Sequence, residues 1–92
     1  MMVGIPCCDE RLTTPVGWDA TTSYTNAAIK AIDDDMKDVC QQASIPYVPT
    51  FETFVEQLGQ GRRLMADGLH PNNDGHHLMF ELMLPTFQKL AE

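Results

Sequence analysis

The sequence predicts a single α/β domain with parallel strands, and three observations support this prediction. The chain has 92 residues, enough for one small domain. Short apolar segments rich in β-forming residues alternate with longer segments whose apolar residues recur at helical spacing. The resulting order of strand, helix, strand, helix is typical of a βαβ unit with a closing helix, and such a unit forms a parallel sheet.

The first predicted strand is the apolar run from Met1 to Ile5, which Pro6 closes. Residues 7–22 are polar and contain Pro15 and Gly17, so we expect a long loop there. This loop follows the strand directly. It therefore begins at the carboxyl edge of the predicted sheet, where α/β proteins place their ligands.

The first long helix is predicted from Ala28 to Ala43, after a capping Thr25 or Ser23. Its opposite side carries several aspartates, which we interpret as a solvated helix face rather than a functional acidic patch. The apolar positions at helical spacing are Ala28, Ile29, Ile32, Met36, Val39, Cys40 and Ala43, and the aspartates are Asp33, Asp34, Asp35 and Asp38.

The second half of the chain repeats the alternation. Residues 45–48 form the second predicted strand, bounded by prolines, and Phe51 to Leu58 form a short helix that ends at the glycines of residues 59–61. Residues 64–71 lack periodicity. A final helix is predicted from Asn72 onward, with Pro85 kinking or restarting it, because proline cannot donate to the preceding turn.

Two parallel strands are too few for a stable sheet in water, and parallel sheets are normally buried on both faces. The predicted elements also leave the outer side of the first strand uncovered. We therefore expect residues 1–92 to be a single partial α/β domain, either part of a larger sheet or a chain that associates to complete its core.

Composition excludes several classes of function. Thirteen acidic and six basic residues give a net charge of −7, which argues against nucleic acid and anionic membrane surfaces as partners. No apolar run approaches the roughly 20 residues of a membrane-spanning helix. Three cysteines do not form a disulfide framework. The opening residues lack the basic and apolar regions of a signal peptide, which favours a cytoplasmic location.

The candidate catalytic residues are Asp67 and His70. An acid three residues before a histidine, on a loop, can bind one imidazole nitrogen and leave the other free as a base. Pro71 keeps His70 out of the helical region, and Asn72 or Asn73 can cap the helix that follows. The alternative is that His70 is a turn or capping histidine and Asp67 merely pairs with it.

Residues 67–76, Asp-Gly-Leu-His-Pro-Asn-Asn-Asp-Gly-His, resemble the closing block of the GDSL/SGNH hydrolase family. The upstream order of strand, loop, helix and strand is similar to the second half of that family, so the resemblance covers essentially the whole chain. It implies a flavodoxin-like three-layer α/β/α sandwich that hydrolyses carboxylic esters without a metal or organic cofactor. The family's catalytic Asp and His would correspond to Asp67 and His70.

The chain departs from the family in its nucleophile. The family carries its serine in a Gly-Asp-Ser motif, and a Gly and an Asn from later loops complete its oxyanion hole. The present sequence has neither Gly-Asp-Ser nor Gly-x-Asn-Asp, and its only serines are Ser23 and Ser44, at the start and end of a predicted helix. It thus supplies two of the three triad residues.

Other chemistry can be read from the same residues. Cys7 and Cys8 follow the first strand, so a Cys8–His70 pair is conceivable, although buried thiols usually pack as small apolar groups. His70, His76, His77, Asp67 and Asp74 could be read as a metal cluster, but His76 and His77 point to different sides of a helix. Trp18 either lines a substrate entrance or holds its loop down.

Two hypotheses of different class follow. The first is the carboxyl-terminal part of a GDSL/SGNH-type serine ester hydrolase, in which Asp67 orients His70 and an N-terminal portion supplies the serine; alone, such a chain should be inactive. Its partners would be an ester substrate and a complementing chain. The second is a non-catalytic α/β module that assembles with itself or with another chain and retains the motif.

Overall fold

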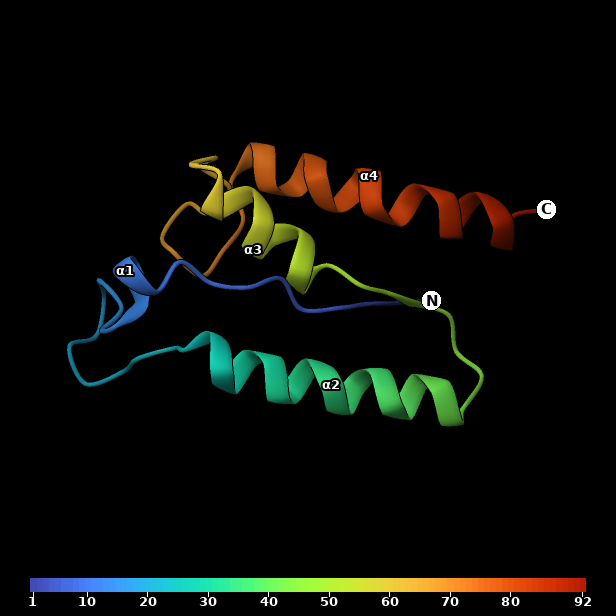
Figure 1. Cartoon of the computed structure of the whole chain (residues 1–92), viewed down its shortest axis with the longest axis horizontal. Coiled ribbons are helices and arrows are strands. Elements are labelled where there is room, and N and C mark those ends of the chain that lie inside the picture. The colour runs from blue at the N-terminus through green and yellow to red at the C-terminus, as the bar shows by residue number, and fades with distance from the viewer.

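The structure, a computed structural model, describes all 92 residues and contains two short strands and four helices (Figure 1). Their order along the chain alternates as predicted. The elements are β1 (Met2–Val3), α1 (Glu10–Thr13), α2 (Asn26–Gln42), β2 (Tyr47–Val48), α3 (Phe51–Gly59) and α4 (Asn73–Leu90).

The two strands form a parallel pair, which confirms the predicted α/β class with parallel strands. Met2 lies opposite Tyr47 and Val3 opposite Val48. The backbone N–H groups of Met2 and Gly4 donate to carbonyls of the second strand segment at 2.8 Å. The strands run between α2 on one side and α4 on the other, and both helices contact β2 (Figure 1). The chain after each strand leads to the end of the molecule that holds α1 and the amino terminus of α4.

Helix α2 begins as predicted, because the Thr25 side chain accepts from the backbone N–H of Ala28 at 3.3 Å. Its buried face matches the predicted one only in part. Ile29 and Cys40 are buried, but Ile32 and Val39 are 55% and 61% exposed.

The interpretation of the four aspartates as one solvated face was wrong for Asp33, which is only 3% exposed. The Tyr47 hydroxyl lies 2.7 Å from each of its carboxylate oxygens, and the backbone N–H of Ile5 donates to Oδ1 at 2.8 Å. These partners offset the loss of hydration that would otherwise exclude a carboxylate from the interior. Burial, and then the neighbouring Asp33, raise the pKa of Tyr47 above its usual value.

Gly4 makes room for this buried group. A Cβ at Gly4 would collide with the Tyr47 hydroxyl and would lie 3.0 Å from the Asp33 Oδ1 atom. The close approach of the Asp33 and Tyr47 side chains to the backbone after β1 therefore requires glycine.

The prediction of an unbroken loop over residues 7–22 was wrong for a short stretch, since Glu10–Thr13 form α1. The Asp9 side chain caps this turn by accepting from the Arg11 N–H at 3.2 Å, and it also binds the Arg11 guanidinium. Four residues are too few to produce a helical apolar period in the sequence.

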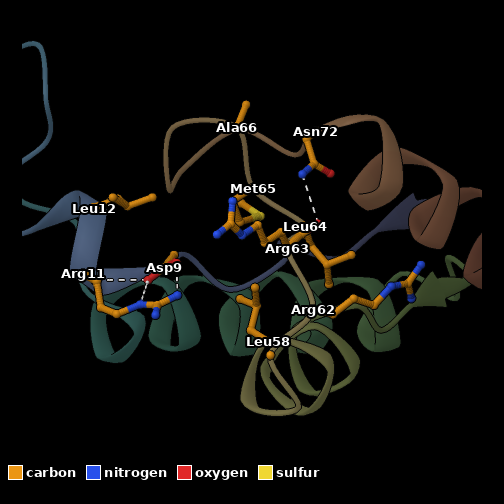
Figure 2. A pocket seen from close by; sticks show the side chains of 11 residues that line it. Asp9, Arg11, Leu12, Leu58, Arg62, Arg63, Leu64, Met65, Ala66 and Asn72 are labelled. Atoms are coloured by element: carbon orange, nitrogen blue, oxygen red, sulfur yellow. Dashed lines mark hydrogen bonds and ion pairs between the residues drawn. The ribbon is translucent and has the colours of Figure 1, made fainter.

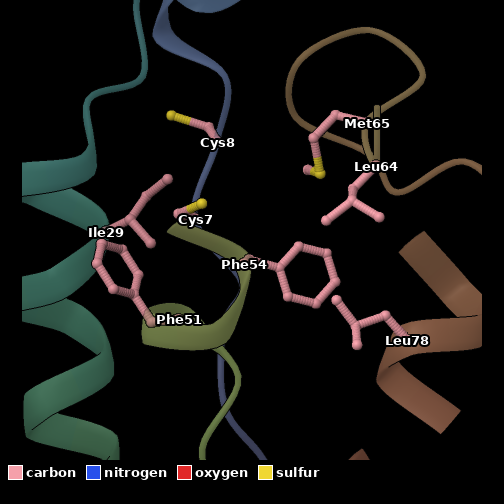
Figure 3. Close-up of a cluster of buried hydrophobic side chains, with 8 residues drawn as sticks. All are labelled: Cys7, Cys8, Ile29, Phe51, Phe54, Leu64, Met65 and Leu78. Carbon is pink, nitrogen blue, oxygen red and sulfur yellow. The ribbon is translucent and has the colours of Figure 1, made fainter. Parts of the chain in front are cut away.

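The last two helices lie close to their predicted bounds, and α4 continues through Pro85 without a new start. Leu78 is the buried apolar residue of α4 and packs into the core formed with residues from four other segments (Figure 3). This core consists of Cys7, Cys8, Ile29, Phe51, Phe54, Leu64, Met65 and Leu78.

The molecule is more open than a compact domain of its length. Its radius of gyration is 14.1 Å, where a compact domain of this length has about 12 Å. Its accessible surface is 6020 Å², against about 5,400 Å² for a compact monomer of the same mass. Several large apolar side chains are exposed, among them Phe80, Phe87 and Leu90 of α4. No helix combines the length and the apolar character needed to cross a membrane.

Candidate active site

Asp67 and His70 lie together on the loop between α3 and α4, as the sequence predicts. The Asp67 Oδ1 atom accepts from the backbone N–H groups of Leu69 and His70 at 2.9 and 2.7 Å. Its second oxygen, Oδ2, lies 2.7 Å from the His70 Nδ1 atom. One carboxylate thus shapes the turn with one oxygen and orients the imidazole with the other.

The charge of Asp67 decides which imidazole nitrogen carries the proton. Backbone hydrogen bonds from His70 and Leu69, followed by the contact with the His70 side chain, lower the pKa of Asp67 to about 2. Asp67 is therefore ionised near neutral pH and can only accept hydrogen bonds. The His70 Nδ1 atom must then be the donor, so Nε2 of the neutral ring is the free acceptor. The His70 side chain is 68% exposed.

Gly68 connects this turn to the segment that follows β1. Its φ of +92° lies in the left-handed region, and a Cβ there would lie 2.6 Å from the Leu12 Cβ atom and 2.9 Å from the Thr13 Cγ2 atom. The backbone N–H of Asp9 donates to the Gly68 carbonyl at 2.8 Å. The glycine of the Asp-Gly-Leu-His sequence is thus required by both conformation and packing.

The remaining residues of the closing block fix the amino terminus of α4. Asn72, rather than Asn73, is the N-cap, and its Oδ1 atom accepts from the Gly75 N–H at 2.9 Å. Its Nδ2 atom donates to the Arg63 carbonyl at 3.1 Å. A Cβ at Gly75 would collide with the Leu64 carbonyl oxygen. Helix and loop therefore approach backbone to backbone directly after His70.

Trp18, for which the sequence leaves two roles open, lies next to His70. The two ring centroids are 6.2 Å apart and the ring planes are inclined by 45°. Trp18 is 56% exposed. The sequence offered no signal for this proximity, because the two residues are 52 positions apart.

Cys7 and Cys8 make no hydrogen bond with His70. Both are buried, and burial, followed by the neighbouring Cys8, raises the pKa of the Cys7 thiol to about 11. The Cys8 Sγ atom donates to the Tyr24 carbonyl at 3.6 Å and accepts from the Thr13 hydroxyl at 3.5 Å. These thiols belong to the core cluster, which favours the interpretation that they pack as small apolar groups.

The two serines of the chain flank α2. Ser23 is exposed on the segment before α2, and Ser44 follows the carboxyl terminus of α2, at the other end of the molecule (Figure 1). No hydrogen bond joins either serine to His70. Neither serine is therefore paired with His70 as a nucleophile in this structure.

The other two histidines, His76 and His77, lie on α4. His77 binds Glu81 one helical turn away, with 2.8 Å between Nε2 and Oε1. His76 and Asp74 are exposed in the first turns of α4. No three side chains of the metal-binding types gather at one point. The structure thus does not assemble the alternative cluster of His70, His76, His77, Asp67 and Asp74.

A cavity of about 780 Å³ lies between α1 and the segment before Asp67 (Figure 2). Neither Asp67 nor His70 lines it, so this cavity and the oriented histidine are distinct features. All three arginines of the chain border it, and Arg11 is held there by Asp9. Leu58, Leu64 and Met65 supply apolar walls. We place the candidate active site at His70, because there a carboxylate that two backbone N–H groups hold in place orients a base.

Comparison with known proteins gives one match. Residues 5–78 match the model of the GDSL-like lipase/acylhydrolase family. The matched range begins just after β1 and includes α1, α2, β2, α3 and the whole Asp67–Gly75 block. No curated protein and no solved structure matches the chain.

Proposed function

Since the chain belongs to the GDSL-like lipase/acylhydrolase family, we propose that it is the carboxyl-terminal part of an SGNH-type serine hydrolase of carboxylic esters. Asp67 and His70 are then the acid and the histidine of its catalytic triad. An N-terminal portion supplies the serine and the oxyanion hole, and its strands complete a flavodoxin-like three-layer α/β/α sandwich.

The observation that carries this proposal is the orientation of His70. The Asp67 carboxylate holds Nδ1 at 2.7 Å and leaves Nε2 free to accept a proton. In the proposed reaction, Nε2 takes the proton of the serine hydroxyl as its oxygen attacks the ester carbonyl carbon. The imidazolium that forms is stabilised by the ionised Asp67, which does not itself need to take up the proton.

The surfaces of the chain support an N-terminal partner segment. The far edge of β1 pairs with no strand, and an unpaired edge is a template for a neighbouring strand. The exposed Phe80, Phe87 and Leu90 side chains of α4 form an apolar face that a larger sheet would cover. In this proposal both surfaces contact the complementing polypeptide.

Complementation tests the proposal directly. The chain is coexpressed with the N-terminal portion of a GDSL-family esterase. This portion includes the Gly-Asp-Ser motif and ends before the closing block of that esterase. We expect hydrolysis of p-nitrophenyl acetate by the pair and none by this chain alone above its His70→Ala variant, because the chain lacks a nucleophile and oxyanion donors.

Matched variants identify the histidine responsible. His70→Ala should abolish the restored activity, and Asp67→Asn should lower it by several orders of magnitude, since the imidazole then loses its orienting charge. His76→Ala removes an exposed histidine six residues away and should leave the rate unchanged. Restored activity that survives His70→Ala would refute the assignment.

A further inference from the structure

The loop that carries Trp18 is closed on itself and anchored to the core. The Val16 N–H donates to the Thr22 carbonyl at 2.9 Å, and the Val16 side chain is buried. The Asp19 carboxylate accepts from the Thr21 and Thr22 hydroxyls, each at 2.7 Å. Trp18 is thus exposed on a hydrogen-bonded turn whose position is fixed on both sides.

Within the proposed function, the position of the Trp18 ring beside His70 indicates which part of the ester it contacts. Asp67 occupies the Nδ1 side of the imidazole, so proton transfer takes place on the Nε2 side. When the tetrahedral intermediate collapses, the bond from the carbonyl carbon to the alcohol oxygen breaks and the C=O bond re-forms. The proton on Nε2 passes to that oxygen, which leaves as a neutral alcohol, and acyl-serine remains. Groups that flank the His70 ring therefore meet the alcohol part of the ester.

We propose that Trp18 is a specificity-determining residue that binds the alcohol portion of the substrate through the flat face of a ring. This inference rests on the proposed function for its catalytic meaning. An exposed indole 6.2 Å from the imidazole offers a planar apolar surface, which attracts an aromatic ring or the C–H face of a sugar ring. A short aliphatic alcohol has no such face and gains less.

Trp18 is the only tryptophan of the chain, so its fluorescence reports this site alone. The full chain is titrated separately with benzyl alcohol, methyl glucoside and 1-butanol, with excitation at the red edge of indole absorption. We expect saturable changes, with a ring-bearing alcohol bound about three- to tenfold more tightly than 1-butanol. Preference for benzyl alcohol or for methyl glucoside distinguishes an aryl from a sugar alcohol. Equal affinities for all three alcohols, or no saturable change, would overturn the proposal.

The ring signals of His70, followed by NMR, give a second readout that works without tryptophan. The preferred ring-bearing alcohol should shift them in the wild type and in Trp18→Phe, which keeps a ring, but not in Trp18→Ala. Phe87→Ala removes another exposed ring far from His70 and should leave the shift intact. A shift that persists in Trp18→Ala would refute the role of Trp18.

The complemented enzyme separates this inference from the proposed function. Trp18→Ala should lower kcat/KM for benzyl acetate about three- to tenfold but change that for ethyl acetate less than twofold, since both esters share one acyl group. If the ring-bearing alcohol binds at Trp18 but no complemented pair hydrolyses esters, the proposed function fails alone. If the esters are hydrolysed and Trp18→Ala affects both equally, only the alcohol preference fails.

Discussion

The two ends of α4 differ sharply in how they are held. At its amino terminus, Asn72 caps the helix, Gly75 lies against the Leu64 carbonyl, and Leu78 packs in the core. Toward its carboxyl terminus, Phe87 and Leu90 are exposed. The held end is the one that follows His70. The difference indicates that the fold positions the closing block through contacts within the chain, while the far end of the same helix leaves its large apolar side chains exposed.

The largest expected effect compares two phenylalanines. Phe54 is fully buried and Phe87 is 59% exposed. Phe54→Ala should lower the free energy of unfolding by about 3–5 kcal/mol, because it leaves a cavity in the small core. Phe87→Ala should change it by less than about 0.5 kcal/mol. Urea denaturation of both variants measures this. Similar losses would mean that Phe87 is buried in solution, as it would be in an oligomer.

Gly75 tests the contact between helix and loop. Alanine normally stabilises a helix interior relative to glycine by about 1 kcal/mol. At Gly75 the added methyl group would meet the Leu64 carbonyl, so Gly75→Ala should instead destabilise by about 1–3 kcal/mol. Gly59→Ala is the matched control, since nothing lies within 4 Å of its added Cβ. A stabilising Gly75→Ala would show that the approach is looser than described.

The cap should have a smaller effect. Asn72→Ala removes the acceptor for the Gly75 N–H and the donor to the Arg63 carbonyl, and we expect a loss of about 1 kcal/mol. The exposed neighbour Asn73 makes neither contact, so Asn73→Ala should be nearly neutral. Thermal melts of the two variants at equal concentration compare them. A larger loss in Asn73→Ala would reassign the cap.

The smallest effect on stability concerns Asp67, whose carboxylate is exposed enough to be well screened by water. Its native pKa of about 2 lies below the usual value near 4. Its hydrogen bonds therefore stabilise the native state above about pH 4, and this contribution is lost as the pH falls through about 2. Carboxyl NMR should give a midpoint near 2.

A His70→Ala variant refines the Asp67 measurement. Because backbone N–H groups are the main cause of the shift, the Asp67 midpoint should rise only part of the way toward its usual value. A complete return to the usual value would mean that the imidazole, and not the turn, holds the carboxylate.

The sequence predicted the alternation of strands and helices and the Asp67–His70 pair, because both depend on local pattern. The hydrophobic period located α2 but only part of its buried face, since Ile29 and Cys40 are buried while Ile32 and Val39 are exposed. Asp33 is buried only because Tyr47 and the Ile5 N–H reach it from other segments. Such partners cannot be read from one helix.

Two features near the candidate site were also missed for physical reasons. Helix α1 is a single turn fixed by the Asp9 cap, and it is too short to show a period. The approach of Trp18 to His70 depends on how two distant loops meet at the carboxyl edge, which spacing in the sequence does not encode. The glycine positions in the closing block could be noted from the sequence, but their neighbours could not.

The contact of Gly68 with Leu12 and Thr13, together with its bond from Asp9, bears on how such proteins can be recombined. The block from Asp67 to Gly75 is shaped on one side by a segment almost 60 residues earlier. Grafting it alone onto a relative with a bulkier side chain at the position of Leu12 would push Gly68 and tilt the imidazole. Laboratory chimaeras should therefore exchange residues 9–13 and 67–75 together, because the two segments contact each other.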